Sequence, residues 1–377
     1  GWTENIRTAF CDGVNIYGCV IENWTDDGIA LNKHTYNASV WGNILKDAGE
    51  GHIWGAPNAI EIQDGSKNVV CYGNVISINN IEGIKISTHA GEDSCSDVVI
   101  SNNFLKQLNS TSGNTGIDAS TQPAYRIRNV EITDNIIKGG WVKGICFSHC
   151  ENSLIMDNII NNVTIGIRID YGENSLIKDN IINNAATGVL IGYINSRISV
   201  DGNIIAGCKF NGIHVNADSF EIDIINNQVF NAWDTDNVGF SIDGSYVIVR
   251  NNRAEDTQAI HTQRIGIYFY TDSNDCLVEN NYCVNNTEYQ MGNSGTNNIF
   301  HSNVGFVTEN SGTATNTTAT TFVFNHSLAG TPTGVWASFN TTEITSWTWT
   351  ATSTQITITV TGMTDDRTCY WQAIYKP

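Results

Sequence analysis

The side chains of this sequence that could carry out chemistry recur at one place in a repeated pattern, Gly-Ile-x-Ile-x. In a strand with this pattern the two Ile side chains point to one side and the two x side chains to the other. The first x position collects Ala30, Glu61, Lys85, Asp118, Cys146, Arg168, Leu190, His214, Ser241 and Tyr268, and the second collects Asn32, Gln63, Ser87, Ser120, Ser148, Asp170, Gly192, Asn216, Asp243 and Tyr270. An inert face would favour Thr, Ser and Asn, so the charge, His and Tyr found here predict a substrate groove.

The position after these two rows adds aromatic side chains, and it holds Asp64, Thr88, Thr121, His149, Tyr171 and Tyr193. Equivalent residues of stacked strands lie about 4.8 Å apart, so His149 and Tyr171 should be neighbours, with Arg168 on the strand that leads to Tyr171. These three residue types suit β-elimination on a uronate sugar. Arg168 would neutralise the carboxylate, while His149 or Tyr171 removes the C5 proton and the other protonates the leaving oxygen.

Carboxylate pairs offer a competing chemistry. Glu61 and Asp118 should lie two strands apart, about 9.6 Å between backbones, which is within reach of the separation that inverting glycosidases use. Lys85 should lie three strands, roughly 14 Å, from Arg168. It is therefore expected to pair with Asp118 or Glu61, or to hold a neighbouring sugar. The two carboxylates could also hold a Ca²⁺ ion beside a cationic patch made by Lys85, Arg168, His149 and His214.

On this reasoning the sequence predicts His149, Tyr171, Arg168, Lys85 and Asp118 as catalytic residues. The residues predicted to bind substrate are Glu61, Asp170, Tyr193, His214, Asp243 and Tyr268. We expect a lyase that acts on a uronate-containing polysaccharide, ahead of a glycoside hydrolase that uses paired carboxylates. A rod that binds glycan without cleaving it is the third alternative.

The elements that position these residues form a repeat that is clearest from Glu151 to Ile205. An Asn follows a short apolar alternation in each copy, at Asn43, Asn74, Asn103, Asn135, Asn158, Asn180, Asn203, Asn227, Asn252, Asn281 and Asn303, with intervals of 22 to 32 residues and Cys19 in the first copy. Three residues before the Asn is an inward apolar position. A period of this length with two-residue alternation predicts stacked coils of short β-strands, about twelve of them, in a rod on the order of 55 Å long. Asn tolerates the left-handed region of a turn, and its amide can bond the coils above and below, so these residues should form a ladder.

Over residues 11 to 305 the pattern resembles right-handed parallel β-helix proteins, which include polysaccharide lyases, polygalacturonases, mannuronan epimerases and phage tailspikes. The resemblance implies an all-β right-handed parallel β-helix and a protein that is secreted, extracellular or on a virion surface, with a homotrimer as one expected assembly. Asp26 and Asp27 before Gly28 resemble the Asp-Asp strand entry of polygalacturonases, but no Gly-His-Gly follows on the next strand. The Asp-Pro-His of mannuronan epimerases and the Arg-x-Pro-x-x-Arg of classical pectate lyases are absent. No catalytic residue carries over from a family.

The amino-acid composition limits the classes of partner that are expected. Lys plus Arg is 19 against 38 for Asp plus Glu, which disfavours nucleic acid, and no apolar run is long enough for a membrane span. The ten Cys include Cys71 and Cys276 on inward positions, where a free thiol packs as a small apolar group. Cys146 and Cys150 form a close pair around His149, but without a CxxC motif a metal or redox role is disfavoured. The chain opens on GWTENIRTAF without a signal peptide, which suggests a trimmed start.

The period defines the expected domains. Residues 1–305 should form the β-helix, with 1–10 as a cap or truncated coil. Residues 306–316, rich in Thr, Ser, Gly and Asn, are expected to be a linker. Alternating apolar and polar residues between turns predict a small antiparallel β-sandwich at 317–377, in which Trp336, Trp347, Trp349 and Trp371 are expected in the core ahead of a sugar-stacking role.

Overall fold

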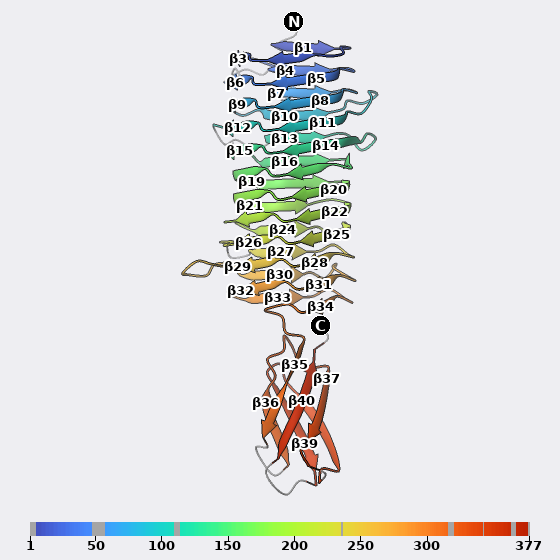
Figure 1. Cartoon of the computed structure of the whole chain (residues 1–377), viewed down its shortest axis with the longest axis vertical. Helices are drawn as coiled ribbons and strands as arrows, with labels where there is room; N and C mark the ends of the chain where they lie inside the picture. The colour runs from blue at the N-terminus through green and yellow to red at the C-terminus, as the bar shows by residue number, and fades with distance from the viewer. Residues whose placement is uncertain are drawn as a thin grey trace.

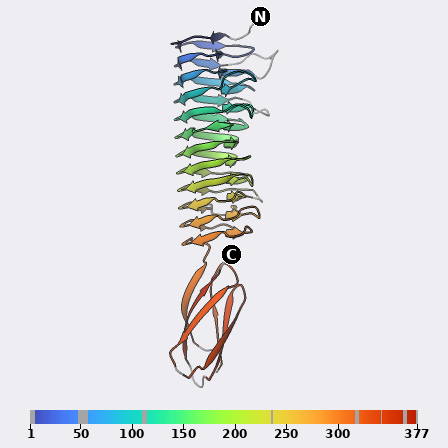
Figure 2. The same cartoon turned by 90° about the vertical axis from the view of Figure 1, so that its right-hand side faces the viewer.

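The protein is a long rod of stacked coils with a smaller β-module at its C-terminal end (Figure 1). This computed structural model describes residues 5–46, 57–108, 114–234, 237–315, 320–341, 343–362 and 367–375. Within these residues there are forty strands and no helix. Seen from the side, the coils stack at regular intervals along the long axis of the rod (Figure 2).

Each coil contributes up to three strands, and equivalent strands pair in parallel to form three faces. Face A carries the Gly-Ile-x-Ile-x segments and consists of β1 (Ile6–Ala9), β4 (Ile29–Asn32), β7 (Asn58–Gln63), β10 (Glu82–Ser87), β13 (Thr115–Ser120), β16 (Lys143–Ser148), the second halves of β19 (Ile159–Asp170) and β21 (Ile181–Ile191), β24 (Asn211–Val215), β27 (Val238–Ile242), β30 (Ile265–Phe269) and β33 (Tyr289–Asn293).

Face B consists of β2 (Asn15–Tyr17), β5 (Tyr36–Trp41), β8 (Lys67–Tyr72), β11 (Ser96–Ser101), β14 (Ile127–Thr133), β17 (Cys150–Glu151), β18 (Leu154–Met156), β20 (Glu173–Lys178), β22 (Ser196–Asp201), β25 (Phe220–Ile225), β28 (Ile248–Arg250), β31 (Leu277–Glu279) and β34 (Ile299–His301). Face C consists of β3 (Val20–Glu22), β6 (Ile44–Lys46), β9 (Val75–Ile78), β12 (Phe104–Gln107), β15 (Ile136–Gly139), the first halves of β19 and β21, β23 (Ile204–Ala206), β26 (Gln228–Phe230), β29 (Arg253–Glu255) and β32 (Tyr282–Val284).

A continuous Asn ladder joins the coils, as the sequence predicted. In each step the backbone N–H and the side-chain amide of one Asn donate to the side-chain oxygen of the next, as from Asn158 to Asn180, both at 3.0 Å. The steps continue without interruption from Asn43 to Asn303. Cys19 occupies the first position and donates its backbone N–H to Asn43. The ladder residues from Asn43 to Asn281 are buried, so this network fixes the stacking register from inside the rod.

One detail of the ladder differs from the expectation. The left-handed conformation is adopted not by the ladder Asn but by the residue immediately before it, such as Asp157 (φ 56°) and Asp179 (φ 52°). The turn is made one residue before the Asn whose backbone N–H is donated to the next coil. In the Asp-Asn and Gly-Asn pairs of the repeat, the first residue therefore makes the turn and the second forms the hydrogen bonds to the next coil.

The core of the rod is a column of stacked Ile and Val side chains, including Ile145, Ile167 and Val189, all fully buried. The Gly that precedes the first inward residue in most face A segments has a steric reason, although Ala59 takes this position in β7. A Cβ atom at Gly166 would lie 2.4 Å from the carbonyl oxygen of Gly188 and 2.7 Å from Ile182, so a larger residue at this position would force the stacked coils to shift. Close stacking at these Gly residues fixes the start of their face A strands and hence the position of the outward residues that follow.

The C-terminal module contains two three-stranded antiparallel sheets. They are formed by β35 (Glu309–Thr315), β40 (Thr368–Ile374) and β37 (Gly334–Phe339), and by β36 (Thr321–Asn325), β39 (Gln355–Thr361) and β38 (Ser346–Ala351). The β-sandwich prediction agrees with this, and Trp371 is in its core, stacked on Phe324, although Trp336 is 53 % exposed.

The expected linker at 306–316 is wrong, because Glu309–Thr315 pairs along its whole length with β40. The Thr, Ser and Gly that resemble a linker here are residues of a sheet strand. Phe306 packs on Phe300 of the last coil, with ring centroids 4.6 Å apart, and Tyr375 of the module lies 6.1 Å from Phe306. The module therefore helps to cover the end of the rod. At the other end, Ile6–Ala9 pairs in parallel with β4, so this part of the expected cap is a strand of a coil.

Candidate functional site

The first outward row of face A has the predicted register. Lys85 pairs with Glu61 on one side and with Asp118 on the other. Two strands beyond Asp118 the row reaches Arg168, which pairs with Cys146. The structure therefore places Glu61 and Asp118 two strands apart, with Lys85 between them, and Lys85 three strands from Arg168.

Glu61 and Asp27 form a buried pair of carboxyl groups at the N-terminal part of this face. Glu61 is 7 % exposed and Asp27 is 5 % exposed. Burial and the hydrogen-bonded Asp27 carboxyl raise the pKa of Glu61 to about 8, against the opposing effects of Lys85 and Gln63. Asp27 is held by Asn58, whose backbone N–H and side-chain amide both donate to it at 2.9 Å. Glu61 is therefore a protonated acid at neutral pH.

Two further carboxyl groups lie beside this pair. Burial and the nearby Asp118 raise the pKa of Glu82 to about 7, although the N–H of Thr115 donates to Glu82 and acts in the opposite direction. Asp118 accepts a hydrogen bond from the hydroxyl of Ser120. Face A thus presents a row of carboxyl groups that differ in environment, and such differences separate acid from base roles.

The arrangement gives little support to a calcium ion at Glu61 and Asp118. Calcium takes six to eight oxygen ligands, whereas here the ammonium-bearing Lys85 occupies the strand between the two carboxyl groups. Among the described residues, no three His, Cys, Asp or Glu side chains are grouped closely enough to hold a metal ion. The calcium ion stays a prediction.

His149 and Tyr171 are neighbours, as predicted from their spacing. Their rings stack with centroids 4.6 Å apart and an interplanar angle of 9°, and Tyr193 extends the stack at 6.1 Å from Tyr171. Both residues have positive φ, 59° and 53°, which places them at the turn that leaves face A. Burial and the nearby Arg126 lower the pKa of His149, so its imidazole is neutral at pH 7.

Arg168 is engaged by its own strand. Its Nε lies 2.6 Å from Asp170, and its guanidinium lies 6.0 Å from the ring of Tyr193. Asp170 also accepts a 3.3 Å hydrogen bond from the N–H of Tyr193. The Arg168 charge is therefore paired with Asp170 within the protein, and its role beside a uronate carboxylate stays a prediction.

The hollow beside the His149–Tyr171 stack is lined by a different arginine. This cavity of about 300 Å³ has Arg126, Glu173 and Phe220 in its walls together with the two stacked rings. Arg126 immediately precedes β14, outside the Gly-Ile-x-Ile-x pattern, so the row analysis missed it. Glu82 was missed for a related reason, because it lies before the Gly of its strand and therefore outside the pattern. Its position next to that Gly could have indicated that it lies on face A.

The remaining predicted substrate-binding residues lie far along the rod. His214 is two strands beyond Arg168 and shares a 2.8 Å hydrogen bond with Ser241, while burial lowers its pKa. Tyr268 lies two strands further and bonds to Ser294 at 2.8 Å. Burial and the nearby Asp272 raise the pKa of Asp243. From Glu61 to Tyr268 is eight strands, or about 38 Å, so these residues and the carboxyl row cannot contact one sugar.

The cysteines fit the packing prediction. All ten are free thiols, and Cys71, Cys150 and Cys276 are buried. Cys146 is in the outward row yet is also buried, and burial raises its pKa to about 12, so it is an unreactive thiol at neutral pH.

Comparison with known proteins identifies the class of fold. The family described as "Right handed beta helix region" matches residues 92–229. No curated protein sequence matches the chain. The chain has the right-handed parallel β-helix fold, and solved structures with this fold are similar along most of its length.

The A-module of a mannuronan C-5 epimerase from Azotobacter vinelandii is similar with a TM-score of 0.55 and 12 % identity, over 78 % of this chain and 87 % of the epimerase module. The tailspike of Escherichia coli bacteriophage HK620, solved in complex with a pentasaccharide, has a TM-score of 0.53 and 10 % identity, over 100 % of this chain and 68 % of the tailspike. PfbA, a surface adhesin of Streptococcus pneumoniae, has a TM-score of 0.51 and 13 % identity, over 80 % of this chain and 81 % of the adhesin. At these identities the likeness concerns the fold alone.

Proposed function

We propose that face A binds a polysaccharide and hydrolyses a glycosidic bond at the carboxyl row, with Glu61 as the general acid and Asp118 as the general base. The observation that carries this proposal is the buried Glu61, whose pKa is raised to about 8, on a strand two away from a second carboxyl group. A glycosidase needs one carboxylic acid that can protonate the leaving oxygen and one carboxylate that activates water.

The environment of Glu61 supports the acid role. Its raised pKa results from burial and from Asp27, which disfavour a second negative charge in the same pocket. When Glu61 gives its proton to the glycosidic oxygen, Lys85 on the adjacent strand stabilises the carboxylate that forms. Asp27 then acts as the group that tunes the acid, held in place by Asn58.

The spacing of the two groups supports the inverting course. The backbones of strands two apart are separated by about 9.6 Å, and from there side chains can reach the roughly 6.5 to 9.5 Å between carboxyl groups that inverting enzymes use to leave room for a water molecule. Asp118 accepts from Ser120, which orients its carboxyl group. In this scheme the Asp118 carboxylate takes a proton from the water that attacks the anomeric carbon, while the leaving oxygen receives the proton of Glu61.

The relatives add support for a carbohydrate ligand, because one acts on mannuronan and another was solved with a pentasaccharide bound. PfbA is a surface adhesin and the HK620 protein is a phage tailspike, which favours a secreted, extracellular or virion-surface location for this chain. Within the described residues no helix is long and apolar enough to cross a membrane.

A β-eliminating lyase is the second candidate, and the stacked His149 and Tyr171 favour it. The neutral imidazole of His149 is suited to remove a proton, and Tyr171 is 4.6 Å away to protonate the leaving oxygen. In this scheme Arg126, which lines the same hollow, replaces Arg168 beside the uronate carboxylate.

Incubation of the protein with a panel of acidic and neutral polysaccharides distinguishes these chemistries. Hydrolysis releases reducing ends without ultraviolet absorbance from an unsaturated product, and this is the result that we expect. Absorbance that rises together with the reducing ends would identify the lyase. Binding without either signal would identify an adhesin and contradict both enzymes.

We also propose that copies of the chain associate side by side as a homotrimer. Face C carries an exposed apolar stripe in strict register, formed by Val20, Ile44, Val75, Phe104, Ile136, Ile159, Ile181 and Ile204. Six of these side chains are between 36 % and 62 % exposed, which gives an apolar patch of roughly 500 Å², at the upper end for a monomer surface. A straight stripe on one side of a rod can be covered by parallel copies around a common axis.

A further inference from the structure

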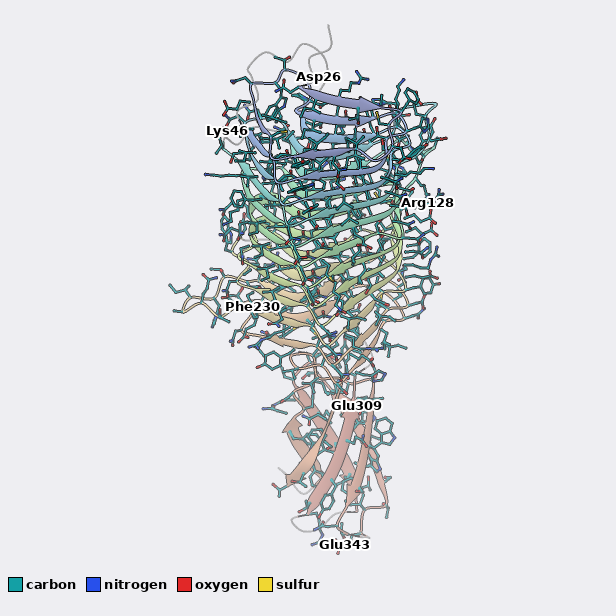
Figure 3. The ribbon with its side chains drawn as sticks, turned by 45° about the horizontal axis from the view of Figure 1, so that its top comes forward. Asp26, Lys46, Arg128, Phe230, Glu309 and Glu343 are labelled. Atoms are coloured by element: carbon teal, nitrogen blue, oxygen red, sulfur yellow. The ribbon has the colours of Figure 1, made fainter. Side chains whose placement is uncertain are left out.

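A second hollow lies on face B, around the corner from the carboxyl row. This cavity of about 430 Å³ is lined by Lys67, Arg126 and Arg128, together with the polar side chains of Ser94 and Ser96. Lys67 and Arg128 are on strands β8 and β14, and both pair in register with Ser96 of β11 between them. Their backbones are therefore about 9.6 Å apart, and long side chains from both strands reach the same space. Arg128 projects from the side of the rod opposite Lys46 and Phe230 (Figure 3).

The positive charge in this hollow contrasts with the negative net charge of the whole chain. The net charge of the protein is −19, yet three cationic side chains line one cavity, with Asp93 as the acidic residue in its wall. The Asp93 side chain is 71 % exposed, so solvent screens its charge. A cluster of like charges costs free energy in the absence of an anion and is stabilised by one.

The two guanidinium groups retain donors for a ligand. Arg128 donates to Glu151 through Nε at 3.1 Å, so this contact does not use its two terminal NH₂ groups. The Nη1 atom of Arg126 is buried without a hydrogen-bond partner, and its ion pair with Glu173 is long, at 3.6 Å. A buried N–H group without a partner is costly, and an oxyanion in the hollow would satisfy it.

Arg126 also connects this hollow to the one beside the stacked rings. It lines both cavities, and the second is formed by His149 and Tyr171 together with apolar Phe220. A cationic hollow next to an aromatic one fits a chain of sugar units, of which one carries an anion and its neighbour lies against the rings.

We propose that Lys67, Arg126 and Arg128 bind an oxyanion, a carboxylate or a sulfate, carried by one sugar residue of an acidic polysaccharide. The identity of the polymer rests on the function proposed above, whereas the anion site itself does not. Arg is suited to bind an oxyanion, because its planar guanidinium can donate two parallel hydrogen bonds to it. The site would hold the polymer from face B while face A performs the cleavage.

Calorimetric titration with a tetragalacturonate and with its carboxyl-reduced, neutral counterpart tests the site. The titrations use Glu61→Gln protein, in which the proposed acid is absent, so that the affinity is measured whether or not the protein is a hydrolase. Arg126→Gln/Arg128→Gln is the test variant in this background. Arg253→Gln, which removes an exposed Arg paired with Glu255 on face C, is the matched control.

We expect the double variant to bind the acidic tetramer at least about tenfold more weakly, with the neutral tetramer unaffected, because charge-assisted bonds are lost. The control should bind as the parent protein does. Equal affinity of the double variant and the control for the acidic tetramer would overturn the site. If inorganic sulfate alone binds as tightly as the tetramer, the hollow is a small-anion site and the polysaccharide assignment is wrong.

Discussion

Glu61 and Asp27 share a hydrogen bond between carboxyl groups that are both more than nine-tenths buried. Glu61 comes from β7 and Asp27 from the turn before β4, so two adjacent coils meet in this contact. The pair can be accommodated only when a proton is present, since two carboxylates at this distance repel each other in a medium that screens poorly. This relationship links the stability of the rod to pH.

The stability of the protein should fall as pH rises. The pKa of Glu61 is near 4.5 when it is unfolded and about 8 when folded, so between these values the folded chain binds more protons. The free energy of unfolding then decreases with rising pH, by on the order of 4 kcal/mol across this window. Glu82, raised to about 7, contributes in the same direction.

Thermal melts of the wild type and Glu61→Gln from pH 4 to 9 check this expectation. The variant should lose much of the pH dependence, because a neutral amide replaces the titrating group. Glu131→Gln, on the exposed side of β14, is the control and should melt as the wild type does at every pH. A wild-type melting temperature that is level over this range, or a variant with the full slope, would contradict the shared proton.

Removal of one rung of the Asn ladder should destabilise the rod. The Asn158 amide donates to Asn180 and to the carbonyl oxygen of Ile132, and its side-chain oxygen accepts from Asn135. Asn158→Ala leaves these buried partners unsatisfied and should cost about 1 to 3 kcal/mol in chemical unfolding. Asn161→Ala removes one hydrogen bond on the outside of the same coil and serves as the comparison. Equal losses for the two variants would mean that the ladder is not a special source of stability.

Charges placed in the face C stripe should abolish self-association. Ile159→Lys and Ile181→Lys each put an ammonium group in the middle of the apolar row, where burial against another copy is costly. Light scattering should show a trimer for the wild type and a monomer for the double variant. Gln228→Lys, in the same row but beyond the apolar part, should leave the trimer intact. A wild type that is monomeric at all concentrations would rule out the proposed assembly.

Whether a truncated chain stays folded and unaggregated should depend strongly on where it ends. A chain that ends at residue 306 keeps Phe306 on the last coil and should remain folded, with a lower melting temperature because the Tyr375 contact is lost. A chain that ends at residue 316 keeps β35 without its partner β40, and an unpaired strand edge of this kind promotes aggregation. Sedimentation of the two truncated chains compares them directly. If the shorter chain unfolds and the longer one does not, the module boundary is elsewhere.

The fold could be predicted because each coil repeats the same physical problem. The Asn of the ladder, the apolar residue three positions before it and the Gly of most face A strands recur in nearly every coil, and each has a local cause. The boundary of the C-terminal module could not be predicted in this way. Its first strand, Glu309–Thr315, is rich in Thr, Ser and Gly, and only its pairing with the distant Thr368–Ile374 shows that it is part of a sheet.

For the candidate site, the sequence predicted which residues are adjacent in the strand register, but not which side chains make contact. The adjacency of His149 to Tyr171 and the two-strand spacing of Glu61 and Asp118 follow from strand stacking alone. Contacts that depend on side-chain direction did not follow. The pairing of Arg168 with Asp170 and the approach of Arg126 from the segment before β14 depend on turns and rotamers that no period encodes.

The turnover of Glu61→Gln on a cleaved polysaccharide tests the central claim most directly. We expect Glu61→Gln and Asp118→Asn each to lower turnover by roughly 10² to 10⁴, the range for loss of a general acid or base. The wild-type rate should fall above pH 8 as Glu61 loses its proton. Glu131→Gln, on the exposed side of β14, is the control and should keep the wild-type rate of hydrolysis. Full activity of Glu61→Gln, together with an inactive His149→Ala, would contradict the account and transfer the chemistry to the stacked rings.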